Sequence, residues 1–174
     1  EEVFIPSDTS YEILKAQMGQ LMYVNEQGML YLILDEKLYE VNLDTLSTKI
    51  VVDGLKENCY KISQSNQYFA WVDADSEYAS ASIQLMNLND GSAYKISESG
   101  NVYLRPLGFI DDDFIYGVAK ADEVRVGAAG NTQFPMMTLK IMDTSEDNHR
   151  IIKEYQPKKG RVDSISVEDY TITV

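Results

Sequence analysis

Cysteine is nearly absent from this chain of 174 residues, in which Cys59 is the only one. One cysteine excludes an intrachain disulfide and any metal site built from paired cysteines. Cys59 stands next to Tyr60 and near Ile62, and this apolar setting predicts a small buried side chain. A catalytic thiol is the alternative, but thiolate chemistry needs a cationic group nearby.

Basic residues are scarce. The chain has 15 Lys and Arg against 28 Asp and Glu, a formal charge of -13. A field of this sign repels phosphate backbones, so the composition argues against nucleic acid as a partner. The only basic cluster, Lys158, Lys159 and Arg161, surrounds Gly160. We interpret it as a solvated turn.

Long apolar runs are also missing. No stretch reaches the ~18 residues that a membrane-spanning helix requires, and no signal-peptide pattern is present. The chain begins with EEVFIP and has no initial Met, which we interpret as a processed or excised piece of a larger protein.

His149 is the only histidine and lies in a polar stretch, SEDNHR. We expect a surface side chain at His149. A histidine metal cluster is excluded because there is no second histidine, and the sequence has no Gly-x-Ser-x-Gly elbow that would supply the serine of a Ser-His-Asp triad.

Strand signals dominate the rest of the sequence, as β-branched and aromatic runs between polar turns. The predicted strands are 20–25, 29–34, 37–43, 48–52, 59–63, 68–73, 80–88, 93–97, 103–110, 114–119, 134–143, 150–155, 161–167 and 170–174. Short connections favour antiparallel neighbours. The strand YFAWVD is apolar on both faces, so Trp71 and the tyrosines are predicted to fill the space between sheets. Pro106 predicts an edge strand or the entry position of a strand, with Arg105 paired to a nearby aspartate.

The strands recur in groups of four. The second strand of each group begins at Met29, Tyr68, Phe114 and Tyr170, at steps of 39, 46 and 56 residues. The third strands share a pattern in which Asn42 matches Asn87, 45 residues later. Imperfect repetition at roughly 40–50 residues, with four strands in each unit, is typical of propeller blades.

The stretch ISQSNQYFAWV followed by SIQLMNLNDGSAYKIS resembles β-propeller repeats of the TolB and WD type. Gln64, Ser65 and Asn66 stand where such repeats usually have Pro-Asp-Gly. The pieces LRPLGFIDDDFIYGVAKADEV and FPMMTLKIMD are similar to large uncharacterised exported proteins of Gram-positive bacteria. The resemblance covers about 20–174 and implies an extracellular or cell-surface location.

We therefore predict an all-β fold of antiparallel four-stranded sheets arranged as propeller-like blades, in one domain, 1–174. The units are about 20–52, 59–97, 103–155 and 161–174, which makes three and a half blades. Closed propellers have about four to eight blades, so the chain is expected to be a fragment. Otherwise its open sheet edges pair with a second copy.

The N-terminal segment is ambiguous between helix and strand. Ser7 or Asp8 could cap a helix that Gly19 ends. We favour a strand at Tyr11–Ala16, with Val3–Pro6 as an edge strand before it.

The best candidate for a binding site is the long connection Lys120–Gln133, because long loops on a β scaffold often carry binding. Asp122, Glu123, Arg125 and Asn131 are its polar candidates. In propellers this connection lies on the rim that binds ligands, as the resemblance implies. A tolerated insertion is the alternative.

Two acidic stretches are weaker candidates. Asp73, Asp75 and Glu77 alternate as calcium ligands do, but the Gly and Glu of an EF-hand loop are missing, so we expect a solvated loop without a metal. The run Asp111, Asp112 and Asp113 is explained by turn preference.

The predicted function is a non-enzymatic scaffold that binds a protein or a small ligand such as a glycan. We assign no catalytic residue and no cofactor. The alternative is the propeller part of a hydrolase that acts on peptides or glycans.

Overall fold

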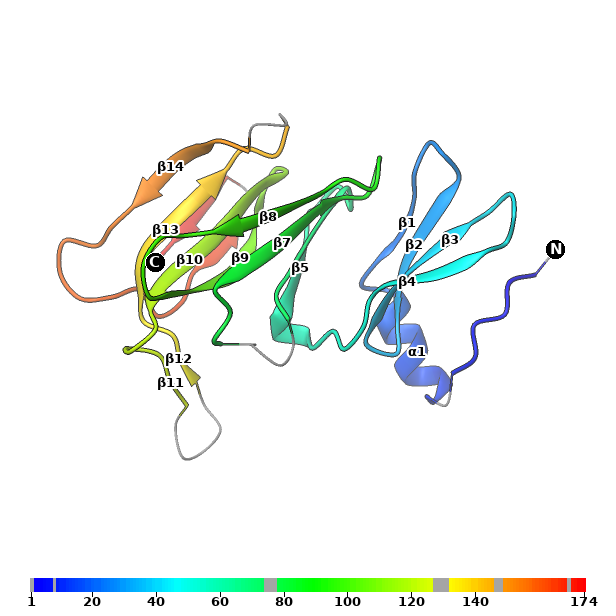
Figure 1. The fold of residues 1–174 in the computed structure, drawn as a ribbon, viewed down its shortest axis with the longest axis horizontal. Helices are drawn as coiled ribbons and strands as arrows, with labels where there is room; N and C mark the ends of the chain where they lie inside the picture. The colour runs from blue at the N-terminus through cyan, green and yellow to red at the C-terminus, as the bar shows by residue number, and fades with distance from the viewer. Residues whose placement is uncertain (1, 8, 74–77, 127–131, 146–148, 169) are drawn as a thin grey trace.

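The computed structural model describes residues 2–7, 9–73, 78–126, 132–145, 149–168 and 170–174. It shows three antiparallel sheets of four strands, which follow one another along the chain (Figure 1). Within each sheet, every strand pairs with the strand of that sheet that precedes or follows it in the chain, so each sheet is a simple meander. The prediction of an all-β fold with propeller-like four-stranded sheets is confirmed.

The strands of the three large sheets lie within or close to the predicted ranges, whereas β11 and β12 lie in the connection that was predicted as a loop. The first sheet contains β1 (Met22–Val24), β2 (Met29–Leu34), β3 (Lys37–Asn42) and β4 (Thr48–Val52). A 3-10 turn, η1 (Glu57–Cys59), leads into β5 (Tyr60–Ile62), β6 (Tyr68–Trp71), β7 (Ser82–Asn87) and β8 (Ala93–Ser97) of the second sheet. The third sheet contains β9 (Val102–Ile110), β10 (Asp113–Lys120), β13 (Met136–Met142) and β14 (Ile151–Tyr155). Two small hairpins complete the fold, β11 (Arg125–Val126) with β12 (Thr132–Gln133), and β15 (Ser166–Glu168) with β16 (Thr171–Thr173).

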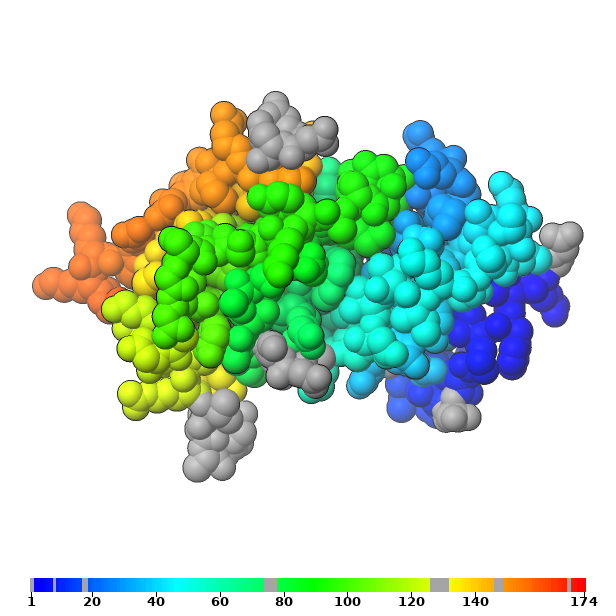
Figure 2. All heavy atoms as spheres, viewed as in Figure 1, coloured from blue at the N-terminus to red at the C-terminus, as the bar shows by residue number. Residues whose placement is uncertain are grey.

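The sheets pack against one another through two apolar clusters. The cluster between the first and second sheets contains Leu21, Tyr31, Ile33, Leu38, Leu55, Tyr60, Phe69, Met86 and Leu88. The cluster between the second and third sheets contains Cys59, Ala70, Val72, Ile83, Leu85, Ile96, Val102, Leu104, Phe114, Tyr116, Val118 and Met142. Cys59 is fully buried, as its apolar neighbours predicted. The resulting body is elongated, with the N-terminal segment at one end (Figure 2).

The first strands of the second and third sheets lie close together, because β5 contacts β9, and β9 in turn contacts β15 of the C-terminal hairpin. This is the arrangement that places the inner strands of propeller blades around an axis. Pro106 lies on β9, an edge strand, as predicted, because an edge position does not require the N–H that proline lacks.

The N-terminal segment is a helix, and our preference for a strand at Tyr11–Ala16 was wrong. Helix α1 (Tyr11–Met18) begins where the Leu14 N–H donates to the Ser10 carbonyl at 3.0 Å, and Gly19 follows its end. Leu14 packs against the outer face of the first sheet, which would otherwise be exposed. The predicted edge strand Val3–Pro6 is also absent, because Val3 and Ile5 pack on that same face.

The predicted fourth unit forms the hairpin β15–β16. Before it, Val162 makes a two-way backbone bridge with Met136, with N–O distances of 2.8 and 2.9 Å. Val162 and Met136 share a third apolar cluster with Phe134. The bridge therefore fixes this last segment to the third sheet. None of the described helices is long and apolar enough to cross a membrane.

Candidate functional site

The connection predicted as a binding loop forms its own hairpin. After β10 the chain leaves the third sheet as β11 and returns as β12, and Arg125 pairs with Gln133. β11 and β12 extend beyond the ends of the strands of the third sheet (Figure 1). Asp122 and Arg125 are exposed, whereas Asn131 lies outside the described residues. For comparison, β2 and β3 are joined by Asp35 and Glu36 alone.

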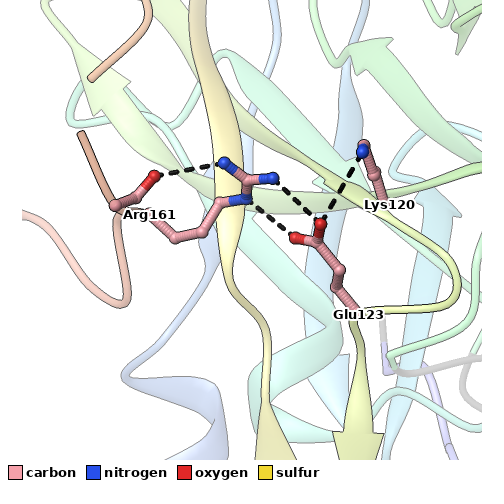
Figure 3. Close-up of polar contacts among 4 residues, drawn as sticks. Lys120, Glu123 and Arg161 are labelled. Atoms are coloured by element: carbon pink, nitrogen blue, oxygen red, sulfur yellow. Dashed lines mark hydrogen bonds and ion pairs between the residues drawn. The ribbon is translucent and has the colours of Figure 1, made fainter. Parts of the chain in front are cut away.

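An ion-pair network holds the base of this hairpin (Figure 3). The Arg161 guanidinium donates to both carboxylate oxygens of Glu123, at 2.7 and 2.9 Å, and Lys120 Nζ lies 3.8 Å from Glu123 Oε1. The hydrogen bond from Arg161 lowers the pKa of Glu123, and the same bond raises the pKa of Arg161. A two-pronged Arg–carboxylate pair restricts geometry more than a single contact does. Glu123 is thus a structural clamp, and of the predicted residues that the structure describes, Asp122 and Arg125 have exposed side chains.

A groove lies between the first and second sheets, with a volume of about 390 Å³. Its lining includes Trp71, Asp73, Gln84 and Lys95. Trp71 is half-buried and packs on Phe69, with ring centroids 5.5 Å apart, which agrees with its predicted packing role. Asp73 is exposed, whereas Asp75 and Glu77 lie outside the described residues. Within the described residues, no group of three or more His, Cys, Asp or Glu side chains is placed to hold a metal ion.

The aspartates 111–113 lie at the turn between β9 and β10. Asp112 Oδ1 accepts a hydrogen bond from Ser65 Oγ at 2.6 Å, which ties the second sheet to the third. Desolvation raises the pKa of Asp113, the nearby Asp143 carboxylate adds to the rise, and a hydrogen bond from the Thr144 backbone opposes it. The Asp112 carboxylate therefore lies at the junction of the second and third sheets.

We expect Asp113→Asn to stabilise the protein at neutral pH by about 0.5 kcal/mol, the scale of a partly exposed charge interaction. A raised folded-state pKa means that the charged carboxyl costs stability above that pKa, and that the cost disappears below the unfolded value of 3.8. Urea unfolding at pH 7 and at pH 3 measures both limits. Asp90→Asn is the matched control with the opposite sign, because hydrogen bonding by Ser92 lowers the Asp90 pKa. A stability loss at pH 7 in Asp113→Asn would contradict the expectation.

Three polar side chains occupy positions that the sequence did not predict. His149 is half-buried instead of exposed: its ring centroid lies 4.2 Å from that of Tyr94, and its buried Nδ1 has no hydrogen-bond partner among the described residues. Lys61 and Arg105 line one opening of about 150 Å³. The guanidinium of Arg105 stacks on Tyr78 and Phe134, and no described aspartate forms the predicted ion pair with it. The sequence signal for Lys61 was a single charge inside an otherwise apolar strand.

No protein-family model matches the sequence, and no curated protein matches it significantly. Among solved structures, the chain is similar to the propeller domain of the Trilobed protease from Pyrococcus furiosus, with 22% identity, 74% of this chain and 38% of that chain covered, and a TM-score of 0.40. For BamB from Moraxella catarrhalis the identity is 13%, the coverage 87% and 38%, and the TM-score 0.41. For the Pyrococcus horikoshii acylaminoacyl peptidase these values are 16%, 90% and 28%, and 0.44. The chain spans less than two thirds of each of those proteins. The similarity is one of fold, to β-propeller domains.

Proposed function

We propose that this chain is a non-catalytic binding scaffold whose partner contacts the β11–β12 hairpin. The observation that carries the proposal is the hairpin itself, which extends past the third sheet while its base is clamped by Glu123 and Arg161. A projecting segment with a fixed base presents side chains at a low entropic cost of ordering. Asp122 and Arg125 supply exposed charges of both signs, which suits a polar protein surface or a glycan.

The location of the scaffold is a further part of this proposal. We propose an extracellular or cell-surface location, and this rests only on the resemblance of Leu104–Val124 and Phe134–Asp143 to exported bacterial proteins noted in the sequence. Contact between copies through the open edges of the outer sheets is the alternative mode of association.

The test shortens the hairpin without disturbing its base. Because Arg125 and Gln133 are direct strand partners, residues 126–132 can be replaced by Asn-Gly, which favours a two-residue hairpin turn. We expect the melting temperature to change by no more than about 4 °C, because loop shortening alters stability only slightly. Asp122 and Arg125 remain in this variant, so loss of partner capture is expected because the partner must also contact the part of the hairpin beyond Arg125.

Capture is measured with a photo-crosslinking residue at position 125 in the full-length protein, expressed in its own host. The same residue at position 95, exposed on β8, is the control. Crosslinks to one partner from position 125 alone, abolished by the Asn-Gly replacement, would support the proposal. Equal crosslinking from both positions, or crosslinks that survive the replacement, would reject it.

A further inference from the structure

Two basic side chains meet where the first strands of the second and third sheets converge. Lys61 lies on β5 and Arg105 on β9, and these strands contact each other. Both side chains line an opening of about 150 Å³, here named the Lys61–Arg105 pocket. Its other walls are Pro106, Leu107 and the segment Asp163, Ser164 and Ile165. The pocket therefore lies beside the contact between β5 and β9.

Arg105 is held in place by two aromatic rings. Its guanidinium carbon lies 5.4 Å from the Tyr78 ring centroid and 6.0 Å from that of Phe134. Phe134 is buried in the third apolar cluster. Arg105 is half-buried, and cation–π attraction to the two rings restricts the position of its guanidinium.

Lys61 is half-buried beside this cation. Desolvation lowers the pKa of Lys61, Arg105 lowers it further, and Glu57 acts in the opposite direction. None of the ion pairs among the described residues includes Lys61 or Arg105. Two like charges in a partly desolvated site cost free energy unless an anion joins them. This is notable in a chain with 28 acidic and 15 basic residues, in which carboxylates are abundant.

We propose that the Lys61–Arg105 pocket binds the carboxylate of a peptide C-terminus or of a small organic acid. The planar guanidinium matches the two oxygens of a carboxylate, and the ammonium adds a point charge. Pro106, Leu107 and Ile165 form an apolar wall for the group that carries the carboxylate. Asp163, an exposed residue of the lining, repels a doubly charged phosphate more strongly than a singly charged carboxylate. The pocket is separate from the β11–β12 hairpin, and this inference does not depend on the proposed function.

The test uses titration calorimetry on the 174-residue chain at fixed ionic strength, with N-acetyl-leucine and N-acetyl-leucinamide as matched probes. We expect the acid to bind and the amide to bind at least about tenfold more weakly, the loss of one charge-assisted hydrogen bond. Isovalerate separates the two sources of the carboxylate. Binding equal to that of N-acetyl-leucine assigns small organic acids, and clearly weaker binding assigns peptide C-termini.

Lys61→Met removes the charge and keeps an apolar stem, and Arg105→Lys keeps the charge and removes the fork. Each variant is expected to weaken N-acetyl-leucine binding by about tenfold or more. Lys95→Met, at an exposed lysine outside the pocket, is the control and should bind as the native chain does. Equal binding of acid and amide, or native affinity in Lys61→Met, would overturn the proposal. Tighter binding of inorganic phosphate than of N-acetyl-leucine would also overturn it.

A folding defect cannot imitate the expected result. Without ligand, Lys61→Met should melt at a higher temperature than the native chain, because it removes a half-buried charge that has no ion-pair partner among the residues the structure describes. Weaker binding by a more stable variant is then a property of the pocket. A lower melting temperature in Lys61→Met would show that Lys61 stabilises the chain by itself and would contradict the argument.

Discussion

Replacing Phe114 with alanine is expected to lower the free energy of unfolding by about 3–5 kcal/mol, the usual cost of truncating a buried phenylalanine. Phe114 is fully buried between the second and third sheets. Its ring centroid lies 5.1 Å from that of Phe109 and 5.8 Å from that of Tyr116. Alanine would leave a cavity that two strands of fixed register cannot close. Because small proteins are stable by only about 5–15 kcal/mol, this is a large share of the total.

Urea unfolding followed by circular dichroism measures this loss across the chain. The fluorescence of Trp71, the only tryptophan, reports separately on the junction of the first two sheets, against which it packs. Coincident transitions would show that the sheets unfold together. Phe4→Ala is the matched control: Phe4 is 86% exposed, and its loss should cost less than about 0.5 kcal/mol. A cost below about 1 kcal/mol for Phe114→Ala would contradict the close packing of the second and third sheets.

The strands could be predicted because their signals are local. In β6, Phe69 and Ala70 are buried and Tyr68 and Trp71 are half-buried, so the apolar pattern on both faces was visible in sequence. The turns that join the meanders are equally local, since short polar connections leave few alternatives to antiparallel pairing.

The N-terminal helix could not be predicted in the same way. Tyr11–Ala16 has apolar residues that fit either a helix or a strand, and their outcome depends on a surface distant in sequence. Leu32 and Leu34 lie on the outer face of the first sheet. Leu14 from α1 packs against this face and covers it. Tertiary packing of this kind decides between local conformations of similar energy.

The Lys61–Arg105 pocket was hidden for a related reason. Its two cations come from different sheets, and only the packing of β5 against β9 brings them together. The hairpin residues could be singled out because they are neighbours in sequence, but the sequence did not show that Arg161, 38 residues away, binds Glu123. This pairing distinguishes Glu123 from Asp122 and Arg125, whose side chains are exposed.

Asn25 forms the polar junction between the first and second sheets. It is 6% exposed. Its Nδ2 donates to the carbonyls of Leu88 and Asn89, at 2.9 and 3.0 Å. Its Oδ1 accepts from the backbone N–H groups of Gln27 and Met29, at 3.0 and 2.9 Å. All four bonding positions of the amide are used, so no other side chain of this shape satisfies both sides.

Asn25→Asp is expected to cost about 2–4 kcal/mol at pH 7, because the buried carboxylate faces two carbonyls as an unpaired acceptor and loses both donors. The fold should raise the pKa of the introduced carboxyl, so the variant recovers stability as the pH falls through that pKa toward the unfolded value of about 3.9. Urea unfolding between pH 7 and pH 4, with the native chain at each pH as reference, measures the recovery. Asn42→Asp is the control, since Asn42 Oδ1 accepts two exposed backbone bonds that a carboxylate accepts equally well. A deficit in Asn25→Asp that is the same at both pH values, or no larger than that of Asn42→Asp, would show that the Asn25 amide does not join the two sheets.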